Sequence, residues 1–279
     1  MMPWNEFSER MARDGYVIIP GFYDVERDIV PIREGITEII RLVSGKHGAD
    51  VPCATPDQAL AEGYQALIAR NRAWGAEVYD AIKQLPAFMR LVAHPSNQDV
   101  VKSLRPDFIP GLAAGGYGIR IDSPAEEKFR TYWHQEFPAQ LRSLDGIVFW
   151  SPLVEIKPDM GPIELCVASH KDGLVAVRND EGGVGRSGAY ALRLEDEQER
   201  VSRYERVAPL TKPGDLILMD FLTLHQSGYN RSDRSRWSMQ FRYFNFADPV
   251  GIEISWQGSF ASGNDFSDIM ARLVGTPRS

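Results

Sequence analysis

The sequence predicts an α+β fold in which helices from the first third of the chain pack outside a β-rich core. Two observations lead to this expectation. Between residues 24 and 94, apolar residues recur at three- and four-residue spacing, which is typical of amphipathic helices. From about residue 115, short runs rich in β-branched and aromatic residues alternate with Pro and Gly turns, which is typical of an antiparallel sandwich or barrel.

Residues 4–13 form a short amphipathic pattern, and GYVIIPGF over 15–22 is rich in β-branched residues, so a helix and a strand are expected before the helical region. Five later runs are predicted to be strands, namely FRTYWHQ, GIVFWSPLVEI, IELCVAS, DLILMDFLTLH and RWSMQFRYFNF.

The chain is expected to form a single domain over 1–279, with a mainly helical part over 1–95 and the β core over 100–250. Residues 178–206 are charged and Gly-rich and interrupt the strand series. They are predicted to form a long loop that acts as a lid, because loops of that length are usually functional or mobile. Residues 251–279 form a C-terminal extension.

Composition excludes several functional classes. The formal charge of −7, without any run of Lys and Arg interleaved with aromatics, argues against nucleic acid as a partner. The longest apolar stretches fall well short of the roughly 20 residues that span a bilayer, and the first residues lack the pattern of a signal peptide. We therefore expect a cytoplasmic protein that has no membrane partner. The oligomeric state is not indicated.

A candidate metal site comes from three side chains. His134 and Glu136 lie in a run that resembles a strand, where positions two apart project from the same face. His225, at the end of an apolar run, is the best third ligand. Two His and one carboxylate form a facial triad that leaves three coordination positions open. A His-x-Glu pair alone arises by chance in many proteins, so the hypothesis depends on the whole set.

The run after His225 has two different faces. Alternation places Trp237, Met239, Phe241 and Tyr243 on one face, and Arg236, Ser238, Gln240 and Arg242 on the other. If the polar face is buried, its arginines need an anionic partner, and a guanidinium suits a carboxylate. The alternative is a solvated outer face with surface arginines.

The motifs resemble those of the phytanoyl-CoA dioxygenase family over roughly residues 7–245. The pieces DGYVIIPGF, WHQE, GPIELCVASHKDG and KPGDLILMDFLTLHQSGYNRSDRSRW occur in the order and approximate spacing of that family. The resemblance implies a double-stranded β-helix, or cupin-like jelly roll, with helices outside. It also implies an oxygenase that uses iron(II), 2-oxoglutarate and dioxygen, and that hydroxylates a small-molecule substrate with release of succinate and carbon dioxide. The basic and aromatic residues of 178–206 indicate a polar or anionic small molecule as that substrate.

The resemblance also assigns residues. The family's metal motif is His-x-Asp followed later by a His, which correspond here to His134, Glu136 and His225; the Glu departs from the usual Asp. In the family, an Arg eleven positions after the last His binds the distal carboxylate of 2-oxoglutarate, and Arg236 has that position, with Ser227 in the place of an assisting hydroxyl. Arg120 either points into the mouth of the barrel and binds substrate or cosubstrate, or lies on a surface strand.

Two other functions remain open from the sequence. Two His and one Glu also suit catalytic zinc, so a zinc-dependent hydrolase or isomerase on a cupin-like barrel is one alternative. That alternative leaves Arg236 without a purpose, and the helical His-Glu-x-x-His signature of zinc proteases is absent. The other alternative is a non-catalytic jelly roll that binds a ligand or partner.

Overall fold

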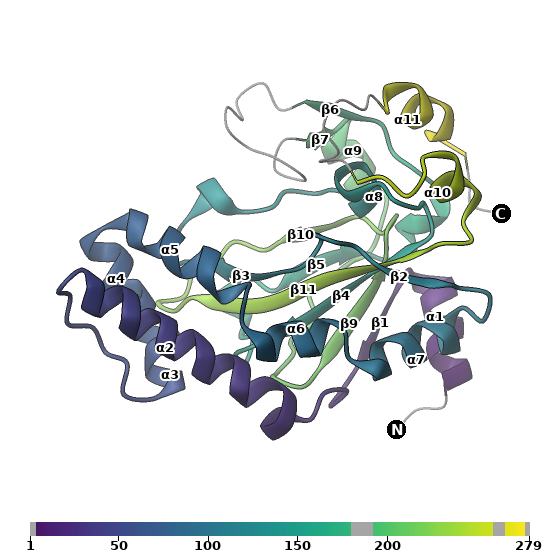
Figure 1. The fold of residues 1–279 in the computed structure, drawn as a ribbon. Helices are drawn as coiled ribbons and strands as arrows, with labels where there is room; N and C mark the ends of the chain where they lie inside the picture. The colour runs from purple at the N-terminus through teal and green to yellow at the C-terminus, as the bar shows by residue number, and fades with distance from the viewer. Residues whose placement is uncertain (1–3, 180–191, 259–265, 277–279) are drawn as a thin grey trace.

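A computed structural model describes residues 4–179, 192–258 and 266–276 (Figure 1). Its centre is a six-stranded antiparallel sheet, in which the strand order is β1, β9, β4, β11 and β2, with β3 also paired to β11. These strands are β1 (Tyr16–Ile19), β2 (Pro110–Leu112), β3 (Gly118–Asp122), β4 (Gly146–Pro152), β9 (Leu216–Asp220) and β11 (Arg236–Asn245). The expected α+β class is confirmed.

A smaller antiparallel sheet has the order β10, β5, β8. Its strands are β10 (His225–Ser227), β5 (Ile163–Cys166) and β8 (Arg206–Val207), and a separate hairpin pairs β6 (Val177–Asn179) with β7 (Leu192–Leu194). The predicted run DLILMDFLTLH therefore supplies strands to both sheets, because the chain turns after Asp220, where Thr223 N bonds the Asp220 carbonyl. This turn carries His225 from the large sheet to the small one.

The two faces of the large sheet belong to different hydrophobic cores. Side chains such as Phe149 and Trp237 pack with the helices, whereas Val148 and Met219 pack with Leu165 of the small sheet. This alternation follows from the two-residue period of a strand. Because both faces are covered, β4 and β9 are apolar along nearly their whole length.

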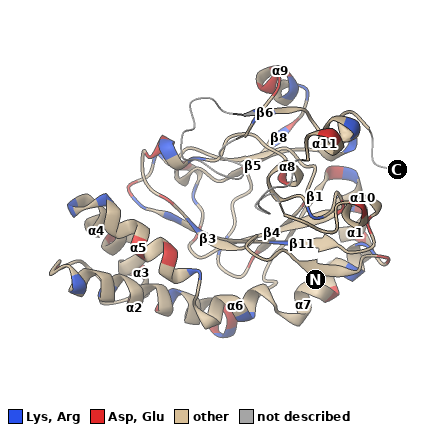
Figure 2. Cartoon of the chain, turned by 45° about the horizontal axis from the view of Figure 1, so that its top comes forward, with Lys and Arg blue, Asp and Glu red and all other residues tan. Residues whose placement is uncertain are grey.

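Helices of the first third cover one face of the large sheet, as predicted (Figure 1). They are α1 (Trp4–Asp14), α2 (Val30–Lys46), α3 (Pro56–Gln58), α4 (Tyr64–Arg70), α5 (Arg72–Ile82), α6 (Pro86–Val92) and α7 (Pro95–Leu104), with π-helical turns at Val25–Ile29 and Ala59–Gly63. Several of them have a proline in the first turn. A backbone N–H at that position has no partner within the helix, so the absence of this N–H in proline costs no hydrogen bond. Charged residues of both signs are interspersed on these helices and on the loops (Figure 2).

The remaining helices are short, namely α8 (Glu136–Gln140), α9 (Glu197–Ser202), α10 (Pro249–Glu253) and α11 (Ser267–Leu273). In Figure 1 they lie on the side of the large sheet away from α2 and α6. Within the described ranges, no helix combines the length and the apolarity needed to cross a membrane.

Two predictions about local structure are wrong. FRTYWHQ is not a strand: it contains the end of a 3-10 turn (Glu127–Phe129) and then an irregular segment, in which only His134 makes an isolated bridge. Pro138 lies in the first turn of α8 and cannot donate to a ladder, so a helix follows in place of a strand. Residues 178–206 are not one loop, because they include β7 and α9. The lid role stays a prediction, as residues 180–191 lie outside the described part.

Candidate active site

Three buried side chains converge between the two sheets. His134 and His225 form an antiparallel bridge through two backbone hydrogen bonds of 3.0 and 3.1 Å, so their rings lie side by side with centroids 4.1 Å apart. Glu136 follows as the first residue of α8, and its backbone N–H donates to the carbonyl of Phe221. The predicted set is therefore brought together, although by a bridge and a helix start and not by a regular strand.

Both imidazoles are held in the same tautomer. Nδ1–H of His134 donates to the carbonyl of Tyr132 over 2.8 Å, and Nδ1–H of His225 donates to the carbonyl of Thr223 over 2.9 Å. A backbone carbonyl only accepts, so each ring must carry a proton on Nδ1, and in the neutral ring Nε2 is then the acceptor. Metal-binding histidines are commonly oriented through such bonds.

The charge states also suit a metal. Burial and the neighbouring His225 lower the pKa of His134 from 6.5 to about 3, so this imidazole is neutral. Burial alone would raise the pKa of Glu136, but Arg242 and the two imidazoles outweigh burial and hold that pKa below its ordinary value. Neutral imidazole and ionised carboxylate are the forms that coordinate metals.

The Glu136 carboxylate has one satisfied oxygen and one that is not. Oε1 accepts a hydrogen bond from Nε of Arg242, whereas Oε2 is buried without a partner among the described residues. Oε2 lies 3.6 Å from Nε2 of His225 and 3.9 Å from Nε2 of His134. Two ligands each about 2.1 Å from one ion are at most about 4.2 Å apart, so these distances fit a shared divalent ion.

A cavity of about 220 Å³ opens beside the triad. It is bordered by residues from both sheets and from α5, which include aromatic and uncharged polar side chains: Tyr79, Tyr117, Thr131, Gln140, Trp150, Gln226, Ser227 and Gln240. Its charged lining residues besides Glu136 are Arg120 and Arg242. A few polar groups on apolar walls are typical of a small-molecule site.

A second buried charge cluster joins β3 to β11. The carboxylate of Asp122 accepts from Nε of Arg120 at 2.8 Å and from Nη2 of Arg236 at 2.7 Å. Nη1 of Arg120 donates to the hydroxyl of Thr131, whose carbonyl accepts from the backbone N–H of Ser227. One carboxylate of the described residues thus faces two guanidiniums.

The cluster also contains unpartnered donors. Nη1 of Arg236 and the hydroxyl of Ser238 are buried and have no hydrogen-bond partner in the part of the chain that the structure describes. Both side chains belong to the polar face of β11, and this face is buried, not solvated. A ligand carboxylate would satisfy such groups, because buried donors without partners are costly.

The predicted cofactor-binding residues have different positions. Ser227 and Arg120 border the cavity, and Arg120 is 8% exposed, so the surface alternative for it is wrong. Arg236 is 1% exposed and is not among the residues that border the cavity, since Asp122 lies against it. Two site residues were not singled out from the sequence, namely Asp122 and Thr131, whereas Arg242 was named only as an arginine of the polar face. Arg120 and Asp122 lie two positions apart in GIRID, on the same face of a strand, and this was the available signal for Asp122.

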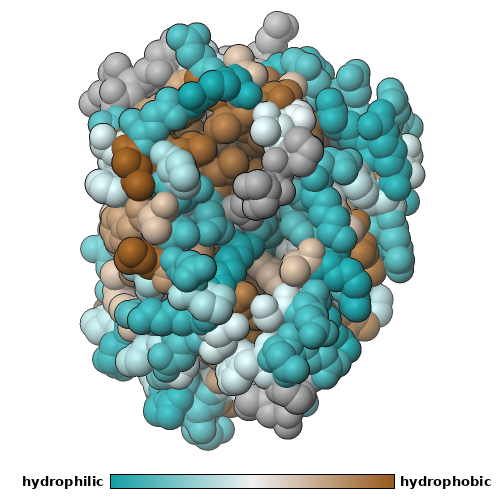
Figure 3. Space-filling model, turned by 90° about the vertical axis from the view of Figure 1, so that its right-hand side faces the viewer, coloured by the Kyte–Doolittle hydropathy of each residue, from teal (hydrophilic) through white to brown (hydrophobic). Residues whose placement is uncertain are grey.

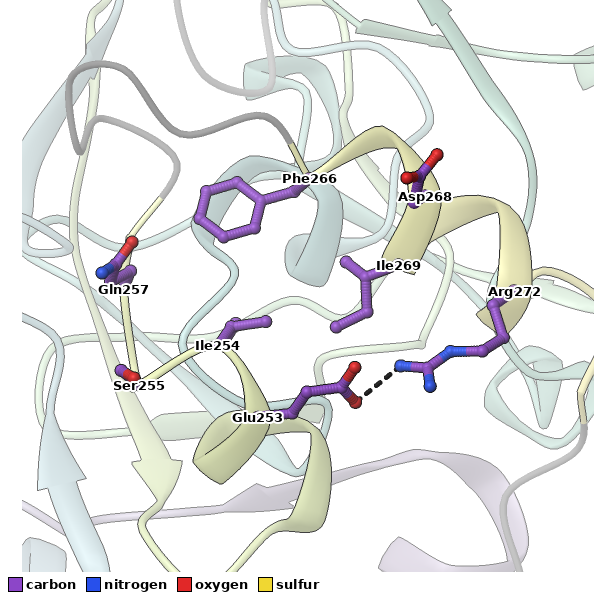
Figure 4. A pocket seen from close by; sticks show the side chains of 8 residues that line it. All are labelled: Glu253, Ile254, Ser255, Gln257, Phe266, Asp268, Ile269 and Arg272. Atoms are coloured by element: carbon purple, nitrogen blue, oxygen red, sulfur yellow. Dashed lines mark hydrogen bonds and ion pairs between the residues drawn. The ribbon is translucent and has the colours of Figure 1, made fainter.

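A larger hollow of about 530 Å³ lies between α10 and α11. Figure 4 shows Ile254, Phe266 and Ile269 directed into it, with an ion pair of 2.6 Å between Glu253 and Arg272 at its edge. Figure 3 views the same side of the molecule, where a hydrophobic recess interrupts a mainly hydrophilic surface. The hollow is separate from the triad, and its residues supply no group of potential metal ligands among the described ones.

Comparison with known proteins identifies the family. The family model of phytanoyl-CoA dioxygenase matches residues 11–238. The chain belongs to the phytanoyl-CoA dioxygenase family. This member is a 2-oxoglutarate-dependent non-haem iron oxygenase whose cofactors are iron and 2-oxoglutarate, with dioxygen as oxidant. The zinc hydrolase and the non-catalytic alternatives are therefore wrong.

Individual relatives are distant in sequence. The oxygenase is 23% identical over 232 residues to ectoine dioxygenase from Sphingopyxis alaskensis, a match that covers 78% of this chain and 68% of the relative. Among solved structures, EctD from S. alaskensis with 2-oxoglutarate and 5-hydroxyectoine has a TM-score of 0.55 at 19% identity, covering 90% and 80% of the two chains. The α-ketoglutarate-dependent carbocyclase SnoK from nogalamycin biosynthesis has a TM-score of 0.56 at 17% identity, covering 98% and 92%.

Asp122 provides a test of the charge cluster. Asp122→Asn should lower the free energy of unfolding at pH 7 by about 3 kcal/mol or more, because it leaves two buried guanidiniums without their anion. Burial raises the pKa of Asp122, but Arg120 and Arg236 outweigh burial and lower it. A lowered pKa stabilises the fold above the ordinary Asp value, so the difference between variant and wild type should narrow only below about pH 4.

Urea unfolding from pH 7 down to pH 3 measures this difference. Asp80→Asn is the control, since Asp80 has a 72% exposed side chain that pairs with Lys83 at the surface and should contribute less than about 1 kcal/mol. An equally small effect at Asp122 would contradict the prediction.

Proposed function

We propose that the enzyme hydroxylates a C–H bond of a small polar molecule, with iron(II) held by His134, Glu136 and His225. The observation that carries this assignment is Oε2 of Glu136, which is buried, has no hydrogen-bond partner among the described residues and faces both Nε2 atoms. A buried anionic oxygen without a donor is costly, and a divalent ion would satisfy it. The three residues fit iron because a set of two His and one carboxylate is typical of non-haem iron oxygenases.

The same proposal assigns the cosubstrate to the buried charge cluster. Arg236 and Ser227 would hold the distal carboxylate of 2-oxoglutarate, and Arg120 would add positive charge beside them. Nη1 of Arg236, which is buried without a hydrogen-bond partner among the described residues, supports this assignment. Hydrogen bonds between charged groups in a buried site are strong, and a planar guanidinium orients a carboxylate.

Iron and 2-oxoglutarate, when bound, activate dioxygen for C–H oxidation, with oxidative decarboxylation of the cosubstrate to succinate and carbon dioxide. The protein contributes positioning and exclusion of water. The carbonyls of Tyr132 and Thr223 hold the two imidazoles in one tautomer, and apolar side chains such as Trp150 limit access of water to the cavity. The two sheets would be the halves of a double-stranded β-helix within a single oxygenase domain.

The substrate class rests on the cavity and on the relatives. Gln140, Gln240 and Tyr79 offer uncharged polar groups, which suits a polar substrate. The relative named ectoine dioxygenase and the solved EctD with 5-hydroxyectoine support a small polar compound.

Metal binding tests the triad directly. His225→Ala and Glu136→Ala should each weaken iron(II) binding by at least 100-fold, because each removes one of three protein ligands. Anaerobic titration followed by metal analysis measures the change. His47→Ala is the control, as His47 stacks on Trp74 in the helical layer. Unchanged iron binding in either triad variant would remove the assignment.

Arg236 tests the cosubstrate assignment. Arg236→Ala should raise the dissociation constant for 2-oxoglutarate by about 10- to 100-fold, since a hydrogen bond to a charged group contributes about 1.5–3 kcal/mol, while iron(II) binding stays largely intact. The visible charge-transfer band formed when 2-oxoglutarate is added to the anaerobic iron protein reports the binding. Arg234→Ala is the matched control, because Arg234 is an exposed neighbour of the same turn. Equal cosubstrate affinity in wild type and Arg236→Ala would defeat the assignment.

The reaction itself is tested by substrate screening. A substrate should increase succinate release in the presence of iron(II), 2-oxoglutarate and dioxygen, and mass spectrometry should find a product heavier by one oxygen atom. Halogenated, desaturated or epimerised products in place of a hydroxylated one would show that the enzyme catalyses another reaction, and would contradict the proposed hydroxylation. His225→Ala, which lacks a metal ligand, provides the inactive control.

A further inference from the structure

We propose that Arg242 is a positioning residue that holds the Glu136 carboxylate so that a single oxygen is presented to the metal. This inference rests on the proposed metal triad, and it concerns a residue outside that triad. It explains how this chain uses Glu at a position where its family usually has Asp.

The two carboxylate oxygens of Glu136 have different surroundings. Nε of Arg242 donates to Oε1 over 2.8 Å, while Oε2 has no partner among the described residues and faces the two Nε2 atoms. Glu136 is 1% exposed, so water does not compete for Oε1. With Oε1 committed to the guanidinium, Oε2 alone is left for a metal.

The guanidinium of Arg242 is itself fixed by further hydrogen bonds. Arg242 is 8% exposed on β11, where Nη1 donates to the carbonyl of Gly116 at 3.2 Å and Nη2 donates to Oε1 of Gln240 at 3.3 Å. All three nitrogens therefore have a protein acceptor. The single N–H of Nε is committed to Glu136, and the bonds of Nη1 and Nη2 fix the plane of the guanidinium, which favours a positioning role.

The length of the Glu136 side chain allows both contacts. Glu has one methylene more than Asp, and its carboxylate spans from the start of α8 to both β11 and the imidazole pair. An Asp at residue 136 is too short to keep both contacts without movement of the backbone. Glu136 and Arg242 consequently act as a unit, so a substitution of one should change the effect that a substitution of the other has on metal affinity.

Cobalt(II) is a suitable probe, because its binding and visible spectrum need neither 2-oxoglutarate nor turnover. Arg242→Met keeps a long side chain without the charge and should weaken cobalt(II) binding by about 10- to 100-fold, the usual effect of losing a partner of a metal ligand. It should also change the visible bands, since the freed Oε1 can approach the metal. Arg242→Lys should give a smaller change in the same direction, because one ammonium cannot replace three nitrogens.

Controls separate positioning from folding. Arg142→Met removes another partly buried guanidinium, which bonds the carbonyl of Ala114 and does not touch Glu136, and it should leave affinity and spectrum unchanged. Circular dichroism and thermal unfolding without metal establish that each variant is folded. If Arg242→Met does not fold, Arg242→Lys gives the same comparison.

A double-variant cycle completes the test. Glu136→Asp should weaken cobalt(II) binding, and adding Arg242→Met to it should cost much less than Arg242→Met costs in the wild type. Folded Arg242 variants with wild-type affinity and spectrum, or strictly additive effects in the cycle, would overturn the inference. A wild-type protein that binds no cobalt(II) or iron(II) would instead overturn the proposed triad.

Discussion

The backbone bridge between His134 and His225 is the constraint on which the site depends. Two hydrogen bonds join an irregular segment before α8 to the first residue of β10, and they place two imidazoles from distant parts of the sequence side by side. The bridge also sets the direction in which the chain enters α8, whose first residue is Glu136. Loss of this pairing would separate all three proposed ligands at once.

Several charged side chains are buried around this bridge, and they lie next to partners of opposite charge. Two of the buried carboxylates are paired with arginines in this region: Asp122 with Arg120 and Arg236, and Glu136 with Arg242. Burial of these groups is tolerated only because they are paired, since an isolated charge in this interior would be very unfavourable. In these two charge clusters, Oε2 of Glu136 and Nη1 of Arg236 have no hydrogen-bond partner among the described residues, and they are the groups to which we assign metal and cosubstrate.

The large sheet makes this arrangement possible by having two different faces. Residues of β11 alternate between the core under the helices and the space between the sheets, so each charged side chain on β11 is flanked by an apolar anchor such as Trp237 or Phe241. Those anchors hold the strand rigidly. Sites placed on well-packed strands keep their geometry better than sites on loops, which is consistent with a triad supported from both sheets.

The sequence by itself determined the helical first third, most of the strands, the two faces of β11 and the three residues that converge. Periodicity and residue type are local properties, so they can be read without coordinates. FRTYWHQ has the composition of a strand, but a helix begins directly after it at Glu136. The sequence therefore could not show that His134 lies in an isolated bridge. Nor could it show that the polar face of β11 is buried.

Only the tertiary structure decided which charged groups are partners. Asp122 lies far from Arg236 in sequence, and Glu136 lies far from Arg242, yet each pair meets within hydrogen-bond distance because β3 pairs with β11 and α8 packs against the cavity. Charge pairing across such separations depends on the register of strands and on the closure of two sheets around one space. These are properties of the whole fold, and no local pattern encodes them.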